Sequence, residues 1–246
     1  MARELLQLSG RFIFQKIGIE LFNMVKIHNK DILFGITGKD NEWEKKLSDL
    51  NNLHVETAAL FLERFGETQR KKIYLALLQS SLKNIPLCHI KNDMEVEELV
   101  FLEAKFKTEY FTVHESSFSF LPKWPGFEKK IFLEMDYNNS ISKRVDVEKI
   151  GGFCIDLAHF KAAMTCFAKE FDYTYFRKEK NLFLCNHLNG YDEEKNKDIH
   201  EIKNLEEFDY LKTLPDFVFS KVIALEVENG ITEQIEFKNY LVKTYK

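Results

Sequence analysis

A chain of 246 residues, 45% of them apolar, is long enough to bury a sizeable core, and its 30% of charged residues suits a solvated helical surface. The net charge of −4 argues against extensive nonspecific contact with nucleic-acid phosphates. No apolar run reaches the roughly 18 residues of a membrane span, and the charged first ten residues do not resemble a secretory signal. The four cysteines form no CxxC pair, which favours reduced, buried thiols in a cytoplasmic protein.

Short apolar runs alternate with helical patterns along the chain. The runs predict eight strands, at 31–37, 53–58, 85–89, 110–114, 130–134, 152–156, 182–187 and 222–226. The helical patterns fall at 67–83, 94–107, 159–171, 205–213 and 233–245. This alternation predicts parallel strands with crossover helices, and eight such strands predict an α/β fold of the (β/α)8 TIM barrel type. Residues 31–246 are assigned to one barrel domain, and residues 1–30 to an N-terminal extension or displaced first element.

Metal-ligand residue types stand at the ends of six predicted strands. They are His89, His114, Glu134, Asp156, His187 and Glu226. A strand buried on both faces should not end in a charge or an imidazole without a partner, because unpaired burial costs several kcal/mol. The carboxyl ends of parallel barrel strands meet at one rim, where these six side chains would be brought together. A divalent metal site at that rim is the simplest arrangement that satisfies them.

Three further residues join this set. His159 follows Asp156 in the pattern DLAH, at the start of the sixth strand-to-helix connection. Asp198 and His200, in KDIHE, are two residues apart, so an extended segment places both side chains on the same side. The sequence therefore offers nine candidate metal ligands, five of which are histidines.

Each candidate also has an ordinary structural interpretation. A single histidine at a strand end is often a hydrogen-bonded loop residue, and Asp156 or Asp198 could be a helix N-cap or a turn residue. Glu228 lies two residues beyond Glu226 and could replace it as a ligand. Glu56, in the second predicted strand, could point into the barrel or away from it. All these interpretations would have to hold at six strand ends at once, so the set as a whole favours a metal site.

The segments GGFCIDLAHF (151–160), NHLNG (186–190) and DIHE (198–201) resemble the metal-binding blocks of the endonuclease IV group, zinc-dependent apurinic/apyrimidinic endonucleases of the xylose isomerase-like barrel superfamily. The resemblance covers roughly residue 31 to the C-terminus. It implies a cluster of up to three Zn²⁺ ions, with Glu134 bridging two of them. It also implies three ligand sets: His89 and His114; Asp156, His187 and Glu226; and His159, Asp198 and His200.

The chain departs from this family's pattern at several positions beside the ligands. Glu-Ser-Ser follows His114 where the family has Pro-Gly, and Met135 to Asn138 replace Asn-Thr-Ala-Gly after the bridging glutamate. Gly190 and Ile199 replace a carboxylate and an arginine. These positions shape the DNA groove in the family, so the departures leave metal binding intact and put DNA as the substrate in question.

Three functional hypotheses follow. The first is a metal-dependent phosphodiesterase that hydrolyses DNA at abasic sites or a related phosphodiester, with clustered metals lowering the pKa of a bridging water. The second is an isomerase or epimerase of a small sugar, with one Mn²⁺, Co²⁺ or Mg²⁺ on Glu134, Asp156, His187 and Glu226. In that scheme Glu134 and Glu226 are the paired catalytic acid/base groups. The third is a non-enzymatic barrel that keeps its metals only for structure or has lost its function, which a site closed to solvent with no open coordination position would indicate.

Overall fold

The computed structural model describes residues 27 and 29–245. The prediction for residues 1–30 therefore falls almost wholly outside the described residues, and the division of the chain at residue 30 stays a prediction. Ile27 is buried, and its backbone N–H donates to the carbonyl of Tyr245 at 2.7 Å.

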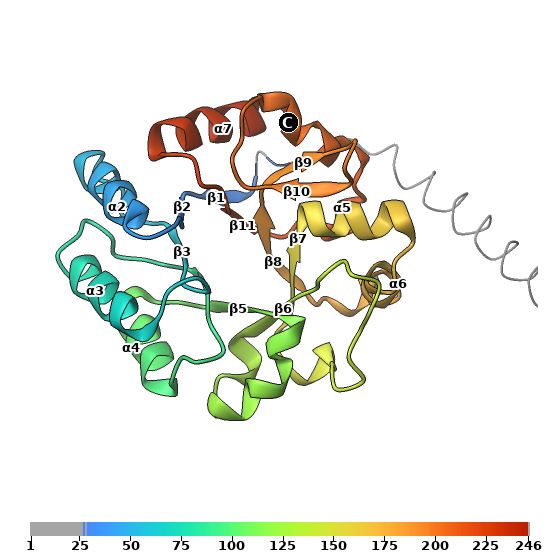
Figure 1. The fold of residues 1–246 in the computed structure, drawn as a ribbon, viewed down its shortest axis with the longest axis horizontal. Helices are drawn as coiled ribbons and strands as arrows, with labels where there is room; N and C mark the ends of the chain where they lie inside the picture. The colour runs from blue at the N-terminus through green and yellow to red at the C-terminus, as the bar shows by residue number, and fades with distance from the viewer. Residues whose placement is uncertain (1–26, 28, 246) are drawn as a thin grey trace, which may run out of the picture.

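The centre of the molecule is a parallel sheet that curves around on itself (Figure 1). Its strands are β1 (Asp31–Leu33), β2 (Gly35–Ile36), β3 (Ala59–Phe61), β4 (Leu87–His89), β5 (Tyr110–His114), β6 (Ile131–Glu134), β7 (Gly152–Asp156), β8 (Phe183–Leu188) and β11 (Val222–Leu225). The order of neighbours is β1-β11-β8-β7-β6-β5-β4-β3-β2. A separate antiparallel pair, β9 (Gly190–Asp192) and β10 (Lys197–Ile199), follows β8.

The two ends of this sheet belong to one interrupted strand. Only Phe34 separates β1, which pairs with β11, from β2, which pairs with β3. A side chain at Gly35 would place its Cβ 1.8 Å from the carbonyl oxygen of Leu225, so glycine permits this close approach. The side-chain amide of Gln234 then bonds both the N–H and the carbonyl of Gly35, at 2.8 and 3.1 Å. The result is a nearly closed parallel barrel, consistent with the predicted TIM-like fold.

Helices surround the sheet (Figure 1). The α-helices are α2 (Glu42–Asn52), α3 (Glu67–Leu77), α4 (Val96–Phe106), α5 (Leu157–Cys166), α6 (Lys169–Tyr175) and α7 (Ile231–Thr244). Short 3₁₀ segments are η1 (Glu115–Lys123), η2 (Glu128–Lys130), η3 (Val147–Lys149), η4 (Lys178–Lys180), η5 (Leu205–Thr213) and η6 (Asp216–Val218). No helix within the described residues combines the length and apolar character needed to cross a membrane.

Several sequence predictions of these elements are corrected. The second strand was expected at 53–58 but lies at Ala59–Phe61, in the fully buried run, while the expected segment is mostly exposed or half-buried. Helix α2 was not predicted. The expected helix at 159–171 is divided into α5 and α6 at Phe167, whose φ of 52° is left-handed and ends α5. The expected helix at 205–213 is the 3₁₀ segment η5. Of the four cysteines, Cys166 is exposed, contrary to the prediction of buried thiols.

The barrel interior explains which side chains reach its rim. A buried cluster inside the sheet contains Leu87, Phe132, Cys154, Cys185 and Ala224, one from each of five strands. Side chains alternate between the two faces of a strand, so the residue two positions further along points the same way. Those residues are His89, Glu134, Asp156, His187 and Glu226. The apolar plug therefore places all five at the carboxyl end of the barrel.

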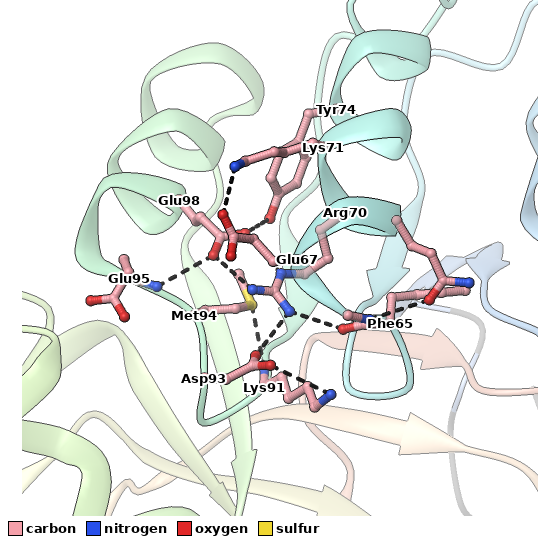
Figure 2. Close-up of polar contacts among 12 residues, drawn as sticks. Phe65, Glu67, Arg70, Lys71, Tyr74, Lys91, Asp93, Met94, Glu95 and Glu98 are labelled. Carbon is pink, nitrogen blue, oxygen red and sulfur yellow. Dashed lines mark hydrogen bonds and ion pairs between the residues drawn. The ribbon is translucent and has the colours of Figure 1, made fainter.

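A buried arginine ties together two of the connections at this end (Figure 2). Arg70 of α3, only 1% exposed, makes a two-pronged ion pair with Glu98 of α4, at 2.8 and 2.9 Å. Its remaining nitrogen donates to Asp93 at 2.8 Å and to the carbonyl of Phe65 at 2.9 Å. Asp93 follows β4 and Phe65 follows β3, so this network fixes both connections next to His89.

Candidate metal centre

Glu134 lies at the centre of the candidate site. Its side chain is 1% exposed, and each of its carboxylate oxygens faces two imidazoles. Oε2 lies 2.9 Å from Nε2 of His89 and 3.0 Å from Nδ1 of His187. Oε1 lies 3.4 Å from Nδ1 of His159 and 4.0 Å from Nδ1 of His114. A carboxylate with histidines on both oxygens has the geometry of a bridging ligand.

Strand register brings the partners of Glu134 into place. His114 of β5 is directly opposite Glu134 of β6, and Asp156 of β7 is directly opposite His187 of β8. On the other side of β8, Glu226 follows β11, and its carboxylate Oε2 lies 3.2 Å from Nδ1 of His187. Parallel pairing alone thus gathers residues that are far apart in the sequence.

Two groups of ligand atoms are compact enough to hold a metal ion. One consists of His89, Glu134 and His187, and the other of Glu134, Asp156, His187 and Glu226, with the ligand atoms of each group within 4.8 Å of one another. Imidazole nitrogens and carboxylate oxygens suit Zn²⁺ and other divalent first-row ions. Since the groups share Glu134 and His187, ions bound in them would lie next to each other.

Asp156 is the N-cap of α5, which the sequence offered as the alternative to a ligand role. One carboxylate oxygen accepts the backbone N–H of His159 at 2.8 Å and caps α5. The other accepts the side-chain amide of Asn189 at 2.8 Å. The N-cap interpretation of Asp156 is therefore confirmed, and the cap also fixes the first turn of the helix that carries His159.

Asp198 and His200 lie beside these groups and contact each other. Oδ2 of Asp198 is 2.9 Å from Nε2 of His200, whose Nδ1 donates to the backbone carbonyl of Glu226 at 2.9 Å. The other oxygen of Asp198 accepts the hydroxyl of Tyr137 at 2.6 Å. The carbonyl of Glu226 thus fixes the His200 ring so that Nε2 is the nitrogen directed toward the candidate ligands.

Residues that the sequence reasoning missed support the imidazoles from behind. The hydroxyl of Thr112 lies 3.1 Å from Nε2 of His187, which leaves Nδ1 facing Glu134 and Glu226. Oε2 of Glu63 lies 3.5 Å from Nδ1 of His89. Glu63 is two residues beyond the interior Phe61, and Thr112 is two beyond Tyr110, so the strand alternation that identified the ligands could have identified these residues too.

Opposite charges shift the titration of these groups. The Glu134 carboxylate raises the pKa of His114 to about 10, against the opposing effect of burial. Burial also lowers the pKa of His200, but its hydrogen bond to Asp198 raises the value to about 9. Burial raises the pKa of Asp156 to about 6. For Glu134, the neighbouring imidazoles outweigh burial and hold the pKa well below its ordinary value.

Unpaired buried atoms gather in this site. Nδ1 of His89, His114, His159 and His187, and Oε2 of Glu226, are all buried without a hydrogen bond of acceptable geometry. Buried polar atoms nearly always have a partner in native proteins. Three of these atoms, Nδ1 of His114, His159 and His187, face the Glu134 carboxylate, and this donor set fits divalent metal ions.

Two residues considered from the sequence lie elsewhere. Glu56 is exposed and ion-paired with Lys83, and it lines a cavity of about 720 Å³ at the amino ends of the strands, away from the candidate ligands. Glu228 bonds Lys39 and Arg64, at 3.2 and 2.9 Å, and belongs to neither compact group. Glu226 rather than Glu228 is therefore the residue brought to the site.

Two of the candidate ligands reach solvent. The side chains of His114 and His200 are 37% and 25% exposed, whereas His89 and His187 are fully buried. The barrel and its buried His/Glu/Asp cluster define a class, a TIM-like barrel with a candidate metal centre. Comparisons of the chain with protein-family models, with curated proteins and with solved structures gave no match.

Proposed function

We propose that this protein is a metal-dependent phosphodiesterase that uses a cluster of divalent ions, up to three and most of them Zn²⁺. The observation that carries the proposal is the Glu134 carboxylate, whose two oxygens face four imidazoles from four different elements. One ion would need fewer ligands than this chain assembles. The sequence resemblance to the endonuclease IV group supports the same proposal.

The residues divide into sets around that carboxylate. His89 and His114 would hold one ion, Asp156, His187 and Glu226 a second, and His159, Asp198 and His200 a third. Divalent ions in such a cluster supply Lewis-acid polarisation of phosphoryl oxygens and lower the pKa of a coordinated water. The chain contributes the fixed orientation of each donor, through the Asp156 cap and the carbonyl that anchors His200.

Solvent access supports an enzyme over a barrel that holds metals for structure alone. A structural zinc site is enclosed by its ligands, whereas a catalytic site keeps a position open to substrate. Here His114 and His200 are partly exposed, on the side where Asp136 also reaches solvent. A substrate phosphate would approach from that side.

One observation favours a second candidate, the sugar isomerase or epimerase. Glu134, Asp156, His187 and Glu226 by themselves form a compact four-residue group, and Asp198 and His200 are paired with each other. In that reaction a single Mn²⁺, Co²⁺ or Mg²⁺ would be held by the four residues, with Glu134 and Glu226 as acid/base groups. The substrate would be a small sugar and not DNA.

Metal analysis combined with substrate assays separates these proposals. Protein purified without added metal would be analysed for Zn, Mn, Fe and Co, then assayed on bis-p-nitrophenyl phosphate, on abasic-site DNA, and on aldose–ketose pairs. Several zinc ions per chain, with phosphodiester hydrolysis abolished in Glu134→Gln and retained in Glu228→Gln, would support the phosphodiesterase. One manganese ion with sugar interconversion would support the isomerase, and a chain that binds no metal would exclude both.

A further inference from the structure

Tyr137 connects two candidate ligands that come from different parts of the chain. It lies three residues after Glu134, in the segment where the sequence departs from the family pattern. Its hydroxyl donates to Oδ1 of Asp198 at 2.6 Å, across 61 positions of sequence. Its ring lies against the imidazole of His159, with the ring centres 4.7 Å apart. Both contacts are made to residues of the third proposed ligand set.

The hydroxyl bonds one oxygen of Asp198 and leaves the other facing the third proposed ligand set. With Oδ1 accepting from Tyr137, the other oxygen, Oδ2, is directed at Nε2 of His200, 2.9 Å away. The carboxylate is therefore held at two points and cannot rotate freely. A phenol hydroxyl is protonated at neutral pH, so Tyr137 is the donor in its bond to Asp198.

The ring restrains the second ligand. Nδ1 of His159 is buried, has no hydrogen bond, and faces Oε1 of Glu134 at 3.4 Å. The Tyr137 ring packs against this imidazole at a tilt of 47° and limits its rotation away from Glu134. One side chain thus orients donors from β10 and from α5 toward the same space.

We propose that Tyr137 is a positioning residue that orients Asp198 and His159 to bind one ion of the cluster. The inference rests on the proposed metal-dependent function. Residues that hold metal ligands from behind typically change metal affinity by about 10- to 100-fold when they are replaced. Tyr137 would act on one ion and leave the ions held by the other ligand sets unaffected.

The test is a chelator-competition titration with Zn²⁺ of wild-type protein, Tyr137→Phe and a control, Tyr240→Phe. Tyr240 also donates its hydroxyl to an aspartate, Asp209 at 2.9 Å, and neither residue contacts the candidate ligands. We expect Tyr137→Phe to lower the affinity for one Zn²⁺ ion by about 10- to 100-fold and to leave the affinity for the other ions unchanged. The Tyr240→Phe protein should bind every ion as the wild type does.

A double-variant cycle distinguishes positioning from a general effect on folding. Asp198→Asn removes the carboxylate that Tyr137 orients. Adding Tyr137→Phe to that variant should therefore lower the affinity for the same ion no further. The inference would be overturned if the two substitutions lower the Zn²⁺ affinity additively, or if the Tyr137→Phe protein binds every ion as the wild type does. The proposed function would stand in either case. Wild-type protein that binds no metal would overturn both.

Discussion

Metal uptake by this protein should release protons. Imidazole must be neutral to bind a metal ion, so a histidine that is protonated in the metal-free protein loses its proton on binding. The pKa of His114 is raised to about 10 by Glu134, and that of His200 to about 9 by Asp198. Both are therefore almost fully protonated at pH 7 when no metal is present.

The size of the effect follows from these two values. Each unit by which a pKa exceeds the pH lowers the apparent metal affinity of that imidazole tenfold. At pH 7 this is about a thousandfold for His114 and about a hundredfold for His200. We expect about two protons to be released, and the combined apparent affinity to rise about a hundredfold per pH unit between pH 6 and 8. His159 and His187, whose pKa values are also raised above the ordinary value, make two a lower bound.

The assay is isothermal titration of metal-free protein with Zn²⁺ at pH 7, in buffers of different ionisation enthalpy. The dependence of the observed heat on the buffer gives the number of protons released. His54→Asn is a suitable control, since His54 is exposed and its φ of 52° is one that asparagine tolerates. A proton count near zero with metal bound, or an equal loss of protons in the His54 and His200 variants, would refute the reasoning.

Three further outcomes can be checked by unfolding. In metal-free protein, protonated His114 and His200 contribute stability that is fully present below about pH 6.5, the pKa of histidine in the unfolded chain. This contribution should be lost as the pH rises through about 9 and 10, the pKa values in the folded chain, so Tm measured in chelator should fall between about pH 6.5 and 10. Arg70→Ala removes a buried cation from Glu98 and Asp93 and should lower the free energy of unfolding in urea by about 3–5 kcal/mol. The control Lys71→Ala, which breaks an exposed ion pair, should change it by less than about 0.5 kcal/mol. Gly35→Ala should cost about 1–3 kcal/mol or more because its Cβ would overlap a carbonyl oxygen 1.8 Å away, and wild-type stability in that variant would contradict the observed barrel closure.

The strand ends were predictable from the sequence because the strands are short apolar runs that stop at polar residues. Strands β5 and β7 begin and end where the sequence indicated, at Tyr110–His114 and Gly152–Asp156. Once parallel pairing is assumed, convergence of their last residues at one rim follows. The wrong position of the second predicted strand also comes from a local pattern. The β-branched residues Val55 and Thr57 suggested a strand at 53–58, whereas the fully buried run begins at Ala58 and contains β3.

Contacts between loops could not be read from local patterns. The bond from Tyr137 to Asp198 depends on where the hairpin of β9 and β10 folds back over the barrel end, which no residue near Tyr137 specifies. The separation of Glu228 from the site, by contrast, depends on its partners Lys39 and Arg64, which are 189 and 164 positions away. Sequence periodicity predicts the face on which a residue lies but not the partner that it meets there.

The interrupted first strand has a consequence for how the chain acquires its structure during synthesis. One edge of β1 is completed only by β11, and the Gly35 backbone by Gln234 of the last helix. Until β11 has been synthesised and has paired, β1 would thus display an unpaired strand edge, which is prone to pair with other molecules. Closure between such distant segments is slow, so the exposed edge would persist during folding and favour aggregation until β1 and β11 pair.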